Sequence, residues 1–261
     1  MGAGMTFLFN RRIYVTVRGI LKSSLPAIAG VGLAAGTAFA GPVNGTGNVT
    51  NNVIMGTGIG NGSWTGVNVD GVEAALRAKL RYDGAGLAQN TFNYDGDHTY
   101  TFDPSTSLIP ANRSVFNFEF SINVNTTGNS GYGDLTALTY LLDFDVDPTG
   151  GTSFVTLDLT TIPDNAYGDN GTAQSGGAEG TFALLGGSNI LMQNSENLGF
   201  GFSVLDPATP GAYTYNLRIL DGTALVASTS IDVNVVPEPG TLALFGLALA
   251  GLGFARRGKK I

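Results

Sequence analysis

Apolar and polar residues alternate strictly in the stretch FNFEFSINV, residues 116–124. Successive side chains of a β-strand point to opposite faces of a sheet, so a period of two predicts a strand with one buried face. The stretch VEAALRAKLRY, residues 72–82, alternates in the same way. The expected buried rows are Val72, Ala74, Leu76, Ala78, Leu80 and Tyr82, and Phe116, Phe118, Phe120, Ile122 and Val124. The residues expected to face solvent are Glu73, Arg77, Lys79, Arg81, Asn117, Glu119, Ser121 and Asn123.

Further strands are expected along the same part of the chain. They cover Leu138–Val146, Phe154–Leu159, Leu198–Val204, Tyr213–Leu220 and Leu225–Val235. The dipeptide Asp221-Gly222 predicts a tight hairpin between the last two. Eight or so antiparallel strands joined by polar turns predict an all-β fold, an antiparallel β-sandwich of the jelly-roll or immunoglobulin-like type.

Two polar stretches fit no strand pattern. Gly41–Gly66 is rich in Gly, Asn and Thr and is expected to form a loose leader or an edge strand. Asp164–Gly180 is expected to be a long polar loop. The predicted sandwich domain therefore covers residues 67–235, behind a leader at residues 41–66.

An apolar run follows a proline-flanked glutamate in the last part of the sequence. The prolines of Pro237-Glu238-Pro239 favour an extended backbone, and the run LALFGLALAGLGFA, Leu242 to Ala255, carries no charge. At 1.5 Å per residue the run spans roughly 21 Å, which is short for a permanent anchor. A transmembrane segment at 241–255 is expected to hold the chain transiently, with its basic end in the cytoplasm; a buried core helix is the alternative. The basic residues that follow are Arg256, Arg257, Lys259 and Lys260.

These parts, in this order, resemble the PEP-CTERM sorting domain of Gram-negative, exopolysaccharide-producing bacteria. The resemblance covers residues 236–261 and implies recognition by an exosortase, a membrane-embedded cysteine transpeptidase. It further implies cleavage near Pro237–Pro239 and delivery to the cell surface or extracellular matrix, and it implies no activity for the rest of the chain. The residues it marks for sorting are Pro237, Glu238, Pro239, Arg256 and Arg257.

The other end has the features of an export signal. The basic residues Arg11, Arg12, Arg18 and Lys22 precede the apolar stretch Leu25–Phe39. Ala38-Phe39-Ala40 then has the A-x-A form that signal peptidase accepts, so residues 1–40 are a predicted signal peptide cut between Ala40 and Gly41. Arg11-Arg12 also resembles a twin-arginine signal, although ordinary secretory export is the expectation.

The body between the two ends is strongly acidic. Gly41 to Val236 holds nineteen Asp and Glu against five Lys and Arg, a net charge of −14. Such a body repels nucleic acid, because it cannot neutralise phosphates. The chain has no cysteine, which excludes disulfides, thiolate metal sites and cysteine nucleophiles.

Three carboxylates alternate along one predicted strand. Asp143, Asp145 and Asp147 would share one face and could bind calcium if the chain turns at Pro148-Thr149-Gly150, because calcium prefers several oxygen ligands. An acidic solvated strand face is the alternative. Calcium is the one candidate cofactor. His98 is the single histidine, and a surface position is expected for it rather than a catalytic one.

The expected function is that of an exported, non-enzymatic surface or matrix protein with a structural or adhesive role within exopolysaccharide. Exosortase and signal peptidase are the expected processing partners, and membrane anchoring is transient. One alternative is a carbohydrate-binding or calcium-dependent adhesin module, and another is a secreted glycan hydrolase or lyase. The aromatic residues considered for a sugar-stacking platform are Trp64, Tyr82, Phe92, Tyr94 and Tyr100.

Overall fold

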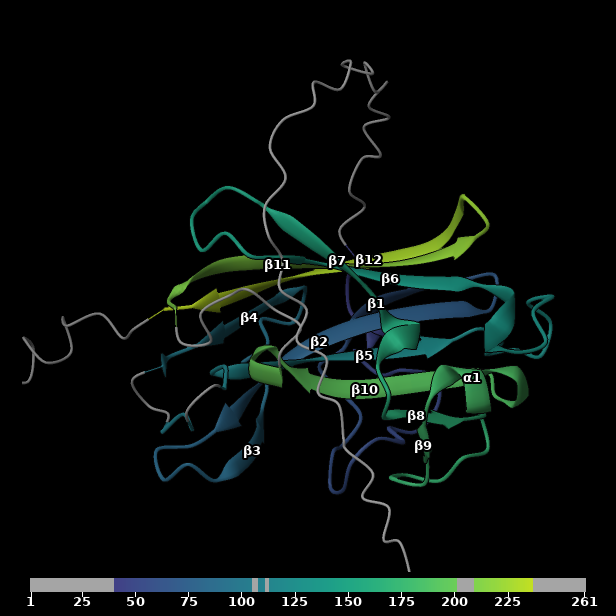
Figure 1. Cartoon of the computed structure of the whole chain (residues 1–261), viewed down its shortest axis with the longest axis horizontal. Coiled ribbons are helices and arrows are strands. Elements are labelled where there is room, and N and C mark those ends of the chain that lie inside the picture. The colour runs from purple at the N-terminus through teal and green to yellow at the C-terminus, as the bar shows by residue number, and fades with distance from the viewer. Residues whose placement is uncertain (1–39, 105–107, 111–112, 201–208, 237–261) are drawn as a thin grey trace, which may run out of the picture. The chain divides into compact units, whose positions relative to one another are not determined.

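A computed structural model describes residues 40–104, 108–110, 113–200 and 209–236. The predicted signal peptide up to Phe39 and the predicted sorting segment beyond Val236 lie outside the described residues. Within them, two sheets pack face to face (Figure 1). The predicted all-β sandwich is therefore confirmed.

The first sheet has seven strands, and two long strands, β2 and β5, form its centre. Its order is β1-β2-β5-β10-β8-β9, and β3 pairs with β2 beside this path. All of its pairings are antiparallel. The strands are β1 (Thr65–Val69), β2 (Val72–Tyr82), β3 (Ala88–Thr91), β5 (Phe116–Asn123), β8 (Asn165–Gly168), β9 (Ala178–Gly180) and β10 (Leu191–Asn197).

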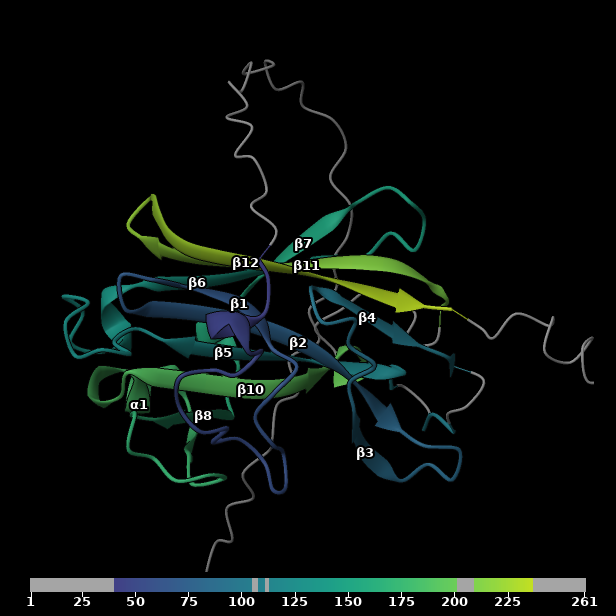
Figure 2. The same cartoon turned by 180° about the vertical axis from the view of Figure 1, so that it is seen from behind.

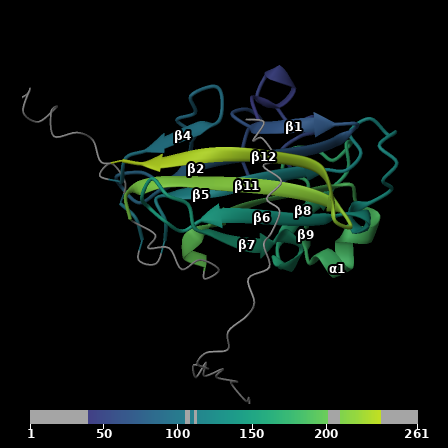
Figure 3. The same cartoon turned by 90° about the horizontal axis from the view of Figure 1, so that it is seen from above.

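The second sheet has five strands in the order β4-β12-β11-β6-β7, which Figure 3 shows from above. β12 and β11 form the predicted hairpin, with Asp221 opposite Ala224 across a two-residue turn. β4 pairs with β12 in parallel, so the sandwich departs from a purely antiparallel one at this edge. The strands are β4 (Thr99–Phe102), β6 (Thr139–Asp145), β7 (Phe154–Asp158), β11 (Gly211–Asp221) and β12 (Ala224–Val235).

Short helical turns connect the strands. Asp134 and Asp158 each cap one by accepting a hydrogen bond from the backbone N–H two residues on. The turns are η1 (Val43–Gly45), η3 (Leu135–Ala137), η4 (Leu159–Thr161), α1 (Phe182–Leu185), η5 (Gly186–Ser188) and η6 (Leu198–Phe200).

The main core lies between the two sheets and holds the apolar rows predicted from the alternation, except that Leu80 and Tyr82 at the end of β2 are only half-buried. Phe118 and Phe120 of β5 are fully buried there, together with Tyr215 and Leu217 of β11. The ring centroids of Phe118 and Tyr215 are 5.6 Å apart, which joins the sheets through an aromatic contact.

Two expected elements have a different structure. Leu198–Phe200 is the turn η6 rather than the start of a strand, because the strand of this region, β10, already ends at Asn197; residues 201–208 lie outside the described part. Asp164–Gly180 is not one long loop. It holds β8 and β9, which pair from Asn165↔Gly180 to Tyr167↔Ala178, and all four residues of β8 are buried.

The predicted leader is a packed cover rather than a loose segment. We call residues 43–64 the covering segment. It lies over the outer face of the seven-stranded sheet, the face turned away from the second sheet (Figure 2). The cluster beneath it joins the covering segment to Ala75 of β2, Ala166 of β8 and Leu191 of β10. Its own buried apolar residues are Val43, Val49, Val53, Ile54, Met55, Ile59 and Trp64.

This cover overturns the expectation that the polar rows of β2 and β5 face solvent. Each of the two sides of these strands is buried, one against the second sheet and the other beneath the covering segment and its surroundings. Alternation identified the strands correctly but could not show that a distant segment shields the polar side. The polar residues found buried are Glu73, Arg77, Lys79, Asn117, Glu119, Ser121 and Asn123; Arg81 is half-buried.

Candidate functional site

A polar cavity of about 430 Å³ opens on the outer face of the seven-stranded sheet. The covering segment contributes Met55, Gly56, Thr57 and Ile59 to its wall. The other walls come from β2, β3, β5 and β10 and from the β8–β9 region. Both charge signs and several amides line it, so the cavity suits a polar ligand rather than an apolar one. Its charged and amide residues are Lys79, Arg81, Asp164, Glu179, Gln89, Asn90, Asn117 and Asn194.

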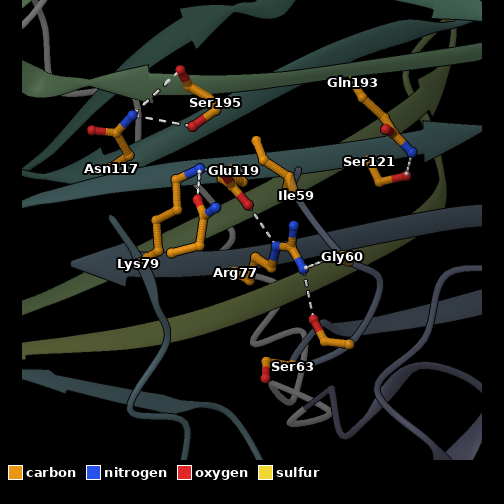
Figure 4. A network of polar contacts seen from close by, with 12 residues as sticks. Ile59, Gly60, Ser63, Arg77, Lys79, Asn117, Glu119, Ser121, Gln193 and Ser195 are labelled. Atoms are coloured by element: carbon orange, nitrogen blue, oxygen red, sulfur yellow. Dashed lines mark hydrogen bonds and ion pairs between the residues drawn. The ribbon is translucent and has the colours of Figure 1, made fainter. Parts of the chain in front are cut away.

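A buried ionic cluster adjoins this cavity. Glu119 of β5 lies directly opposite Arg77 of β2, and its carboxylate accepts a hydrogen bond from Arg77 Nε at 2.5 Å. The other carboxylate oxygen, Oε1, forms an ion pair with Lys79 Nζ. Figure 4 shows the three side chains gathered on this face of the sheet. Two cations thus share one carboxylate, and the side chains of Arg77 and Glu119 are fully buried.

Aromatic rings enclose the Arg77 guanidinium. Its Cζ lies 4.0 Å from the ring centroid of Trp64 and 4.4 Å from that of Phe92, and Nη1 donates to the carbonyls of Gly60 and Gly62. Trp64 itself is fully buried. It therefore packs against a cation inside the protein and offers no surface on which a sugar could stack.

Burial and charge shift the pKa values of the cluster in a consistent way. Desolvation lowers the pKa of Arg77 and of Lys79, although the charge of Glu119 opposes this effect. Burial alone would raise the pKa of Glu119, but the charges of Arg77 and Lys79 outweigh it and lower the pKa. Glu119 is therefore ionised at neutral pH.

A second buried carboxyl has no such partners. Glu196 of β10 is almost fully buried, and burial raises its pKa to about 7, with the charge of Asp164 adding to the shift. Among the described residues no cation forms an ion pair with it.

The outer face of the five-stranded sheet carries the aspartates proposed for calcium. Asp143 accepts two hydrogen bonds from Arg218 of β11, at 2.7 and 2.9 Å, and one from Thr156 of β7. Asp145 and Asp147 instead accept from backbone N–H groups of the turn that follows β6. In the part of the chain that the structure describes, no three His, Cys, Asp or Glu side chains are grouped as a metal site would require. Calcium binding stays a prediction.

His98 lies at the edge where β4 meets β12. Its Nδ1 is 2.8 Å from the Asp97 carboxylate, and its Nε2 is 3.6 Å from that of Asp232. The imidazole is partly exposed, with a carboxylate near each ring nitrogen. This placement agrees with the surface position expected from the sequence.

The packed fold extends to the positions where processing is predicted. The carbonyl of Gly41 accepts a hydrogen bond from Gly66 N–H at 2.9 Å, and Ala40 is buried. At the other end, Val236 N–H donates to the carbonyl of Phe102 at 2.9 Å.

Among the described residues no helix is long and apolar enough to span a bilayer. The proposed site residues outside the described part are Ala38, Pro237, Glu238, Pro239, Arg256 and Arg257, with the predicted membrane segment 241–255.

Sequence reasoning did not find the ionic cluster or the cavity. The available signal was the spacing of apolar residues within the Gly/Asn-rich covering segment, above all Val53-Ile54-Met55 and Trp64. Segments that stay disordered in water have few apolar side chains, so this number of them indicates a packed segment.

A family model matches residues 235–259, and its description is PEP-CTERM protein-sorting motif. No curated protein and no solved structure matches the chain. The match begins at the last residue of β12, one residue before the end of the described part of the chain at Val236. The sorting resemblance drawn from Pro237-Glu238-Pro239 and the apolar run is thereby confirmed: this is a protein with a PEP-CTERM sorting motif at residues 235–259.

Proposed function

We propose that this chain is exported, cut by signal peptidase after Ala40, and cut again by an exosortase near Pro237–Pro239. The observation that carries this proposal is the position of the sorting motif. The motif match starts at Val235, and Val236, the last residue that the structure describes, still donates a backbone hydrogen bond to Phe102. Removing the segments before Gly41 and after Val236 would leave every strand described above in place.

The mature body is proposed to have a non-enzymatic, structural or adhesive role at the cell surface or in the exopolysaccharide matrix of a Gram-negative bacterium. Its charge of −14 supports solubility in such a hydrated matrix. Its fold depends on two apolar clusters, one between the sheets and one beneath the covering segment, rather than on disulfides.

Glu238→Ala tests the sorting proposal in the native host. We expect the variant to be exported but to keep its C-terminal segment, so that its mass exceeds that of the mature wild-type protein and its surface display falls. Glu179→Ala is the matched control, because it removes an exposed glutamate from the body. Deletion of Leu242–Ile261 is expected to abolish membrane retention before cleavage. Unchanged mass and display in both sorting variants would refute the proposal.

The cavity favours a second candidate, a carbohydrate-binding module. Amide and charged side chains that line about 430 Å³ could hydrogen-bond the hydroxyls of a saccharide. Fragments of the host exopolysaccharide should then bind the full chain, and Gln89→Ala with Asn194→Ala should weaken that binding. Trp64 is not a suitable test residue, because its replacement would disturb the core. Release of shorter fragments in the same assay would instead support a glycan hydrolase or lyase.

A further inference from the structure

An amine and a carboxamide at the wall of the cavity, those of Lys79 and Asn90, lie beside a buried carboxylate, that of Glu119. Lys79 Nζ donates a hydrogen bond to Oδ1 of Asn90 at 3.0 Å and also forms an ion pair with Glu119 Oε1. Lys79 is 2% exposed and Glu119 is fully buried. An amine bonded to an amide oxygen lies next to the amide carbon, which is the atom that a nucleophile attacks.

The fold places Asn90 in this position by an irregular pairing. β3 pairs with β2 through Leu80↔Thr91 and Tyr82↔Ala88, so two residues of β3, Gln89 and Asn90, oppose the one residue between those pairs. Such a bulge redirects side chains and breaks the regular ladder. Here it leaves the Asn90 side chain within hydrogen-bond reach of Lys79 on the neighbouring strand.

The electrostatics of the cluster favour loss of the lysine charge. Two buried cations share the single carboxylate of Glu119, which leaves an excess positive charge inside the protein. Desolvation lowers the pKa of Lys79, and the charges of Arg77 and Arg81 add to that effect. A neutral Lys79 would leave Arg77 and Glu119 as a balanced pair.

We propose that Lys79 and Asn90 become joined by an intramolecular amide bond, with Glu119 as the group that moves the protons. Lys79 first transfers its ammonium proton to Glu119, and the neutral amine attacks Cγ of Asn90. The Nζ–Cγ bond forms and the Cγ–Nδ2 bond breaks. A second proton passes from Nζ to Nδ2 through the carboxylate, and ammonia leaves with the first proton as ammonium.

This reaction needs no oxidant, reductant or co-reactant, since one amide replaces another. Lys79 and Asn90 both line the cavity, so ammonia has a direct route to solvent. The bond would attach β3, which pairs with β2 outside the main strand path, to the centre of the sheet. It would supply a covalent cross-link to an exported protein that has no cysteine.

Mass spectrometry of the purified full chain tests the proposal. After overnight incubation at neutral pH, the intact mass should be about 17 Da below the mass calculated from the sequence of the purified protein. This difference is the mass of the ammonia lost. Trypsin should release the peptide 78–81, which contains Lys79, joined to the peptide 82–113, which contains Asn90. An unchanged mass with two separate peptides would overturn the proposal.

Two substitutions at Asn90 separate the proposed bond from other losses of ammonia. Asn90 as a whole residue is exposed to solvent, so its replacement should leave the fold intact. Asn90→Ala should restore the full calculated mass, whereas Asn90→Asp should still form the bond with loss of water, about 18 Da. Lys79→Met should also show no loss. A loss of about 17 Da that persists in Lys79→Met would show a cyclised asparagine instead and would overturn the proposal.

Discussion

The outer faces of the two sheets present similar ion pairs in opposite surroundings. On the seven-stranded sheet, Arg77 and Glu119 are fully buried beneath the covering segment. On the five-stranded sheet, the side chain of Arg218 is 35% exposed and that of Asp143 is 13% exposed. Both pairs join neighbouring strands, and both come from alternating strand sequences. Pairing of neighbouring strands brings the two charges together on each sheet, whereas the contribution of each pair to stability depends on what covers it.

The largest effect is expected where the covered cluster loses a cation. Arg77→Ala should destabilise the fold by about 3–5 kcal/mol, because it breaks the buried ion pair with Glu119 and leaves the carbonyls of Gly60 and Gly62 without their donor. The variant also loses the guanidinium that lies between Trp64 and Phe92. Urea denaturation followed by intrinsic fluorescence measures the change. A cost below about 1 kcal/mol would show that water reaches the cluster.

A buried carboxyl without a cation should respond to pH in the opposite direction to Glu119. The pKa of Glu196 is raised from 4.5 to about 7, so its favourable contribution is complete below pH 4.5 and is lost as the pH rises to 7. Glu196→Gln should therefore change stability little at pH 4.5 and increase it by on the order of 2–3 kcal/mol at pH 8. Denaturation curves at the two pH values provide the test. An equal effect at both would contradict the raised pKa.

The attachment of the covering segment can be weakened at one hydrogen bond. Thr50 donates to the buried carboxylate of Glu73 through both its hydroxyl and its backbone N–H. Thr50→Val keeps the shape and removes the hydroxyl donor, with an expected cost of about 1–2 kcal/mol. Limited proteolysis should then cut faster within residues 43–62. Thr46→Val is a suitable control, since within the described residues the Thr46 hydroxyl bonds only to local backbone, the carbonyl of Val43 and the N–H of Asn48. Equal cutting rates in both variants would contradict this role of Thr50.

The smallest effect is expected on the uncovered face. Arg218→Ala should cost up to about 1 kcal/mol, because solvent screens the pair and hydrates the remaining carboxylate. Raising the salt concentration should reduce that cost further, while it should leave the cost of Arg77→Ala nearly unchanged. A cost for Arg218→Ala as large as that for Arg77→Ala would remove the contrast between the two faces.

The sequence was sufficient to predict the long alternating strands, because a row such as Phe116 to Val124 carries its information locally. The sorting motif was predictable for the same reason, since its three parts are contiguous. The covered face was not predictable in this way. Burial of Arg77 and Glu119 depends on residues 43–64. The hydrogen bond between Lys79 and Asn90 depends on a bulge that no residue pattern predicts.

The short strands of the region after Thr161 show the same limit. Asn165 to Gly168 lies within a stretch rich in Gly, Asn and Asp, yet all four residues are buried against β10 and β9. The amide of Asn165 donates to the carbonyl of Leu159 at 2.9 Å, so a polar side chain serves an interior position. Hydropathy alone predicts a loop there, because it does not record which hydrogen-bond partners the fold supplies.

The cavity, the ionic cluster and the proposed amide bond all require the covering segment to close over the seven-stranded sheet. Carboxyl footprinting of the native full chain with a carbodiimide and an amine tests this directly. Glu73 and Glu119 should be modified far more slowly than the exposed Glu179 and Asp221, and the difference should vanish in urea. Modification of Glu119 in the native protein as fast as that of Glu179 would contradict the account.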